Sequence, residues 1–120
     1  MNIVYQTTFT RIGDYARDSL AEDMVITFRE GAPEDIESYC FIHRPGDGKG
    51  DLRSGETLQL AGTRFPITAV GSVAAQNLRE LGHITIRFDG AEQAEYPGTV
   101  HVSGSTPADI PVGSTLMILA

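Results

Sequence analysis

The chain has 120 residues, of which 41% are hydrophobic and 21% charged, as is typical of a soluble globular protein. Its net charge of −7 excludes the basic surface that nucleic-acid-binding proteins and proteins of anionic membranes carry. No apolar run approaches about 18 residues, and the N-terminus lacks the basic-then-apolar order of a signal peptide. We therefore predict a cytoplasmic protein without direct membrane insertion, in which the single cysteine, Cys40, excludes an internal disulfide.

Alternating or β-branched segments predict about eight short strands along the chain. The expected strands cover residues 2–10, 24–30, 39–43, 57–71 (a hairpin that turns at 61–63), 83–90, 99–104 and 114–120. Two segments, 14–22 and 72–81, favour short helices, the second with Ser72 as N-cap and Gly82 just beyond its end. The expected fold is all-β: a closed or nearly closed β-barrel with one or two short helices, the 72–81 helix covering one end, and residues 1–120 forming a single unit.

The segment 39–52, YCFIHRPGDGKGDL, is a short apolar strand followed by a glycine-rich loop. Strand alternation places Phe41 and His43 on one face and Cys40 and Ile42 on the other. Cys40 is therefore expected to be a buried apolar residue rather than a partner of His43. We expect the His43 ring to lie exposed in a shallow depression, with Phe41 at its rim as a docking residue and Ile42 in the core.

The loop chemistry suits a phosphoryl group. A neutral imidazole can accept a phosphoryl group on nitrogen and pass it on, and loop glycines expose N–H donors that cations can assist. The candidate phosphate-stabilising residues of this loop are Arg44, Gly46, Gly48, Lys49 and Gly50. The pattern predicts a phosphohistidine site at His43, although a surface histidine in a turn would leave the same pattern. Both nucleotide-binding glycine motifs are incomplete here, so no nucleotide cofactor is expected.

Two further histidines, His83 and His101, fall on the polar faces of their predicted strands. Each is either a solvent-facing strand residue or a neighbour of His43 that donates a hydrogen bond to the phosphoryl oxygens. No pair of histidines has the short spacing common in metal sites, so we expect no metal.

Three long runs resemble one known family. They are ITFREGAPEDIESYCFIH (26–43), ITAVGSVAAQNLRELGHITIRFDG (67–90) and AEYPGTVHVSG (94–104). Together they resemble the glucitol/sorbitol-specific IIA component of the bacterial phosphoenolpyruvate-dependent sugar phosphotransferase system, nearly from end to end. The resemblance implies that His43, which closes the CFIH tetrad, is phosphorylated by the phosphocarrier protein HPr. The phosphoryl group then passes to the IIB component of a membrane permease (IIB and IIC), and no cofactor is required.

Two other classes of function remain open from the residues alone. A small β-barrel module that binds a carbohydrate or metabolite would need no transfer chemistry, although an aromatic content of 8% without tryptophan offers few stacking platforms for a sugar. A metal-dependent β-barrel enzyme would use the histidines as ligands and would carry zinc or iron.

Overall fold

The computed structural model describes residues 2–48 and 52–120, which form short strands and three helical segments. The helical segments are the 3₁₀ helix η1 (Ala16–Glu22) and the α-helices α1 (Glu34–Glu37) and α2 (Ala74–Leu81). The strands are β1 (Ile3–Ile12), β2 (Met24–Arg29), β3 (Phe41–His43), β4 (Asp47–Gly48), β5 (Thr57–Leu60), β6 (Thr63–Val70), β7 (Thr85–Arg87), β8 (Thr99–Val102) and β9 (Thr115–Leu119).

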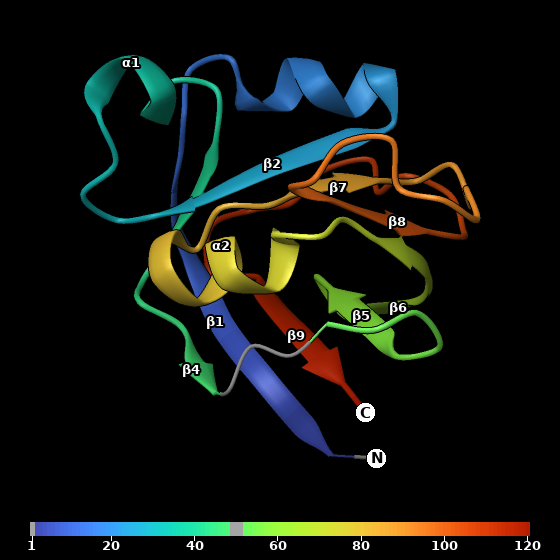
Figure 1. Cartoon of the computed structure of the whole chain (residues 1–120). Helices are drawn as coiled ribbons and strands as arrows, with labels where there is room; N and C mark the ends of the chain where they lie inside the picture. Colours follow the sequence, from blue (N-terminus) through green and yellow to red (C-terminus); the bar gives the residue numbers. More distant parts are fainter. Residues whose placement is uncertain (1, 49–51) are drawn as a thin grey trace.

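The strands close on themselves. Their order is β3-β2-β7-β8-β6-β5-β9-β1-β4, and a further pairing between β3 and β1 closes the strands from β3 through β1 into a ring. Strand β4 lies outside this ring and extends β3 along the same edge of β1. In Figure 1 the chain termini lie side by side, and the backbones of Asn2 and Ala120 exchange two hydrogen bonds of 2.8 Å. The expected closed or nearly closed β-barrel is therefore confirmed.

Two neighbouring pairs in the ring, β2–β3 and β7–β8, are parallel. Parallel neighbours need a connection that crosses from one end of the sheet to the other. Residues 30–40, which include α1, make the first crossing, and residues 88–98 make the second. Each expected strand segment contains an observed strand. The segments α1 and β4 were not expected, because a single turn and a two-residue strand leave no periodic pattern.

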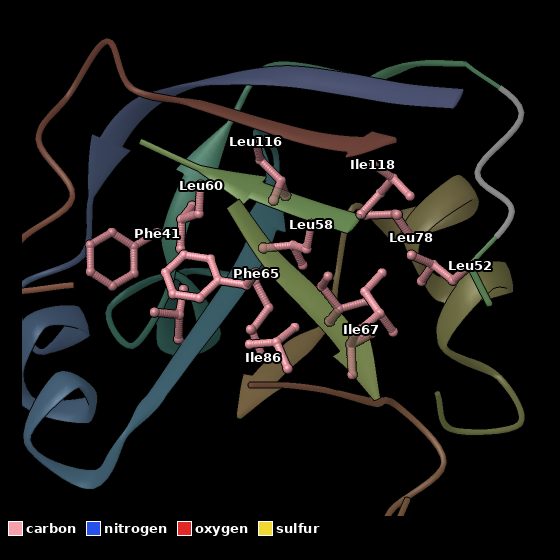
Figure 2. Packing of buried hydrophobic residues seen from close by; sticks show 14 of the residues in the cluster. Phe41, Leu52, Leu58, Leu60, Phe65, Ile67, Leu78, Ile86, Leu116 and Ile118 are labelled. Atoms are coloured by element: carbon pink, nitrogen blue, oxygen red, sulfur yellow. The ribbon is translucent and has the colours of Figure 1, made fainter. Parts of the chain in front are cut away.

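The ring encloses one apolar core, and α2 closes part of it. Figure 2 shows Leu78 of α2 pointing toward Ile118 of β9 and toward Leu52. The helix ends as predicted, with Gly82 in the left-handed region (φ 63°) and its N–H bonded to Leu78 O. The predicted cap at its start was wrong, because Val73 occupies the N-cap position and no side chain caps the helix. Among the described residues, no helix is long and apolar enough to cross a membrane.

Leu78 anchors α2 to the core, so its truncation should destabilise the protein. We expect Leu78→Ala to lower the free energy of unfolding by about 2–5 kcal/mol, because the side chain is 1% exposed and its loss leaves a cavity. The matched control is Leu81→Ala in the same helix, where the side chain is 39% exposed and the loss should stay below about 1 kcal/mol. Chemical denaturation measures both values, and equal losses would contradict this role for Leu78.

Candidate functional site

His43 closes β3, which runs between β1 and β2 in the ring. It is paired in register with Phe9 of β1 and Arg29 of β2. The imidazole meets the Phe9 ring edge-on, with 6.0 Å between centroids, and Phe41 meets Phe9 in the same way at 6.1 Å. The predicted alternation is therefore correct: His43 and Phe41 face the interior of the ring, while Cys40 and Ile42 belong to a separate small cluster.

The His43 ring is buried, with no exposed surface, so the expected exposure in a shallow depression was wrong. Nδ1 lies 2.6 Å from Arg44 O and 3.2 Å from Thr7 Oγ1, and Nε2 lies 2.8 Å from Gly82 O. The side chain is buried because β3 lies between two strands and because the turn after α2 covers the remaining edge of the imidazole.

Each ring nitrogen faces a carbonyl oxygen, which can only accept a hydrogen bond. The carbonyl oxygens of Arg44 and Gly82 are acceptors, and the Thr7 hydroxyl gives its proton to Arg44 O at 2.8 Å. A neutral imidazole has one N–H and one lone pair, whereas an imidazolium has two N–H groups. Both contacts are therefore hydrogen bonds only when the ring is protonated. A neutral ring directs one nitrogen lone pair at a carbonyl oxygen.

Gly82 lies directly on the His43 ring. Its carbonyl accepts a hydrogen bond from Thr27 Oγ1 at 2.9 Å as well as facing His43 Nε2. A methyl group on Gly82 would lie 2.6 Å from His43 Nε2 and 2.9 Å from Arg29 Cβ. Only glycine permits this close approach together with the positive φ angle.

The same glycine lines a solvent-open hollow of about 160 Å³, which we call the arginine hollow. It is formed by Tyr5, Arg29, Pro45, Gly46, Gly48, Leu78, Arg79 and Gly82. The lining therefore includes two arginines and, among the described residues, no aspartate or glutamate. Figure 1 shows how the arginine hollow forms, since α2 lies close to β1 and β4.

The predicted loop residues divide between two surfaces. Gly46 and Gly48 line the arginine hollow, and a methyl group at Gly46 would overlap the Tyr5 hydroxyl. The Arg44 carbonyl holds His43 Nδ1, while Arg44 also lines a second depression of about 190 Å³ with Thr7. Lys49 and Gly50 lie outside the described residues, so their predicted roles stay predictions.

Phe41 was wrongly expected at an exposed rim. It has no exposed surface and packs against Phe9 in the core, so it is no docking residue in this conformation. Ile42 is buried as expected, but in the smaller cluster with Phe28 and Cys40. Cys40 is buried as predicted, and burial raises the pKa of its thiol to about 11.

His83 follows Gly82 but lies against other partners than His43. Its Nδ1 is 3.0 Å from Thr27 O, and its ring is tilted against Phe28 with 4.8 Å between centroids. His83 can therefore position the Gly82 turn, but neither its hydrogen bond nor its ring contact involves His43.

His101 is remote from His43. His101 pairs in register with Arg87 of β7, and Arg87 pairs with Met24 of β2. His43 pairs with Arg29, five residues or about 16 Å further along β2. The sequence left it as either a solvent-facing residue or a neighbour of His43, and both alternatives were wrong. The residue is 2% exposed, and its Nδ1 lies 2.7 Å from Asp89 Oδ1.

The segment between β7 and β8 explains why His101 is buried, since Asp89 in this segment reaches the His101 ring on β8. Burial alone would raise the pKa of the Asp89 carboxyl, but hydrogen bonds from His101 and the Ala91 N–H lower it below its usual value. His101 is therefore a structural partner of Asp89. Within the described residues, no three metal-ligating side chains come together.

Sequence inspection missed Tyr5, Thr7, Arg29 and Arg79. Arg29 and Arg79 stand in the runs that carry the family resemblance, so their position in those runs was the available signal. Tyr5 and Thr7 left no signal, because they reach the site only through the pairing of β1 with β3 and β4.

Comparisons with known proteins agree with the resemblance. The family model of the phosphotransferase system (PTS) glucitol/sorbitol-specific IIA component matches residues 4–117. This chain belongs to that family. Glucitol/sorbitol-specific EIIA components of Shigella flexneri and Escherichia coli K12 are each 60% identical over 116 residues, which cover 97% of this chain and 94% of each relative.

A crystal structure supports the fold of this IIA component. The PTS system IIA component of Enterococcus faecalis V583 superposes with a TM-score of 0.82 at 30% identity, covering 96% of this chain and 99% of the other. Membership of the family gives the chain a phosphotransferase role in sugar uptake.

The contact between Gly82 and His43 can be tested with alanine. We expect Gly82→Ala to lower the unfolding midpoint and to shift the His43 ring resonances in NMR spectra, because the added methyl group overlaps the imidazole. Gly90→Ala is the matched control, since Gly90 has the same φ of 63° but would meet Ser103 Cβ at 3.7 Å, an ordinary contact distance. Indistinguishable behaviour of the two variants would show that Gly82 is required only for its backbone angle.

Proposed function

We propose that residues 1–120 act as one cytoplasmic IIA domain that carries a phosphoryl group on His43. The donor is phospho-HPr, and the acceptor is the IIB component of a glucitol/sorbitol permease whose IIC component spans the membrane. Family membership supports the pathway. The observation that carries the assignment to His43 is its position beside the arginine hollow, from which it is separated by the turn at Gly82.

Nε2 is the nitrogen we assign as acceptor. Nδ1 has two acceptor groups around it, Arg44 O and Thr7 Oγ1, which favour a proton there. With Nδ1 protonated, the Nε2 lone pair is the nucleophile, and it faces a single carbonyl oxygen, that of Gly82. The Nδ1 hydrogen bonds also fix the ring orientation during transfer.

Phosphorylation at Nε2 requires the Gly82 turn to move, because its carbonyl occupies the line of attack. The Thr27 hydroxyl bonds the same carbonyl and can retain it as a partner after the contact with His43 is lost. When the His43 ring is neutral, its Nε2 lone pair and the Gly82 carbonyl oxygen repel each other, and movement of Gly82 removes this unfavourable contact. The resting structure is thus a closed state of the carrier, and docking of a partner would open it.

The direct test uses phosphoenolpyruvate, enzyme I and HPr with purified protein. The wild-type protein should gain one acid-labile, base-stable phosphoryl group, as expected for a phosphorus–nitrogen bond, and His43→Gln should gain none. Glutamine is chosen because its side-chain amide can still donate to a buried carbonyl, whereas alanine would remove the contacts with both Arg44 O and Gly82 O and leave a cavity. A thermal transition establishes that the variant is folded.

His83→Gln is the matched control, since it changes the neighbouring histidine, whose Nδ1 contacts Thr27 O. It should retain the label. Full labelling of the His43→Gln protein would place the acceptor on another residue and overturn the proposal.

A further inference from the structure

The Tyr5 hydroxyl is buried without a hydrogen-bond partner among the described residues. The side chain is 3% exposed, and Gly46 packs so closely against the hydroxyl that no side chain fits at that position. An unpaired buried hydroxyl destabilises the folded state. A phenylalanine would fill the same space without this cost, so the hydroxyl calls for an explanation other than packing.

Two cations share the arginine hollow with Tyr5. Arg29 comes from the end of β2 and Arg79 from the last turn of α2. Neither guanidinium forms a salt bridge with a carboxylate in residues 2–48 or 52–120, although the whole chain has a net charge of −7. A positively charged hollow on an acidic protein is suited to an anion.

The hollow also has the right size and position for the anion that the proposed function supplies. Its volume of about 160 Å³ is several times the share of liquid volume that a water molecule occupies, about 30 Å³, so a phosphoryl group fits. Gly82 connects the two places, because it lines the hollow and at the same time covers the Nε2 edge of His43.

We propose that Tyr5, Arg29 and Arg79 bind the phosphoryl oxygens on His43 once Gly82 has moved aside. This inference rests on the proposed phosphorylation of His43 and adds the residues that would stabilise the transferred group. The Tyr5 hydroxyl donates one hydrogen bond, and the guanidinium groups donate charge-assisted hydrogen bonds to the remaining oxygens.

The transfer step balances without a further reactant. The phosphorus–nitrogen bond of the donor histidine breaks, and its electron pair stays on the donor nitrogen. The Nε2 lone pair of His43 forms the new bond to phosphorus, while Nδ1 keeps its proton, so no proton passes between the two rings. In the transition state, negative charge is spread over the three equatorial oxygens of the phosphoryl group, and hydrogen-bond donors stabilise it there.

The ionisation of Tyr5 agrees with a donor role. Burial raises the pKa of its hydroxyl to about 12, against the opposing effect of the nearby Arg29 charge. The hydroxyl therefore keeps its proton at neutral pH, where it can donate to an oxygen anion.

Tyr5→Phe separates this role from a structural one. We expect transfer from phospho-HPr to slow about tenfold, as for the loss of one hydrogen bond in the transition state, while the thermal midpoint stays equal or rises. The matched control is Tyr96→Phe, where the ring is 56% exposed and lies outside the hollow; its transfer rate should equal that of the wild type. A lower midpoint with an unchanged transfer rate would overturn the inference.

Arg29→Gln and Arg79→Gln test the cations, with Arg64→Gln as control for the same change of net charge on an exposed strand residue. We expect transfer to slow roughly 10- to 100-fold in each hollow variant. The ³¹P titration midpoint of the purified phosphoprotein should also rise, since a neighbouring cation favours the dianion. The midpoint needs no partner, so altered docking cannot account for its shift.

The outcomes distinguish the two proposals. A wild-type protein that gains no label on His43 would overturn the proposed function, and the oxyanion-binding role with it. A normally labelled wild-type protein, with transfer rates and ³¹P midpoints unchanged in the Tyr5, Arg29 and Arg79 variants, would overturn the oxyanion-binding role alone.

Discussion

The close contact between the Gly82 carbonyl and His43 Nε2, 2.8 Å apart, connects the fold of this protein to its chemistry. It joins the end of α2 to the interior end of β3, two segments 39 residues apart in the chain. The contact completes the burial of an imidazole that already lies between two flanking strands, and Gly82 also lines the arginine hollow. In the proposed mechanism, access of a partner to Nε2 therefore depends on this one turn.

Closure of the strand ring makes this arrangement possible. Because β1 pairs with both β3 and β4, it brings Thr7 to Nδ1 of His43 and Tyr5 to the hollow. The parallel pairing of β2 with β3 sets Arg29 beside His43 in register. Helix α2 is held by the buried Leu78, which leaves the adjacent Arg79 at the hollow and Gly82 over the ring. A rigid core thus supports a site whose cover is a single glycine turn.

Local patterns in the sequence were enough for the strands and for the face on which His43 lies. Alternation located the strands, and the glycine after 72–81 marked the end of α2. Exposure of His43 and Phe41 was mispredicted because it depends on which strands flank β3 and on a turn distant in the chain, and neither is encoded in the periodicity of residues 39–43. Tyr5, Arg29 and Arg79 come from three elements that meet only in the folded ring, and His101 is buried by a crossing segment that has no regular pattern.

The most direct measurement of the central claim is a long-range ¹H–¹⁵N correlation spectrum of the His43 imidazole before and after phosphorylation. The account predicts that phosphorus is bonded to Nε2, that Nδ1 stays protonated, and that its hydrogen bond to Arg44 O persists. Phosphorus on Nδ1 would contradict the account, because that nitrogen would have to leave Thr7 and Arg44 while Gly82 remained in place over Nε2.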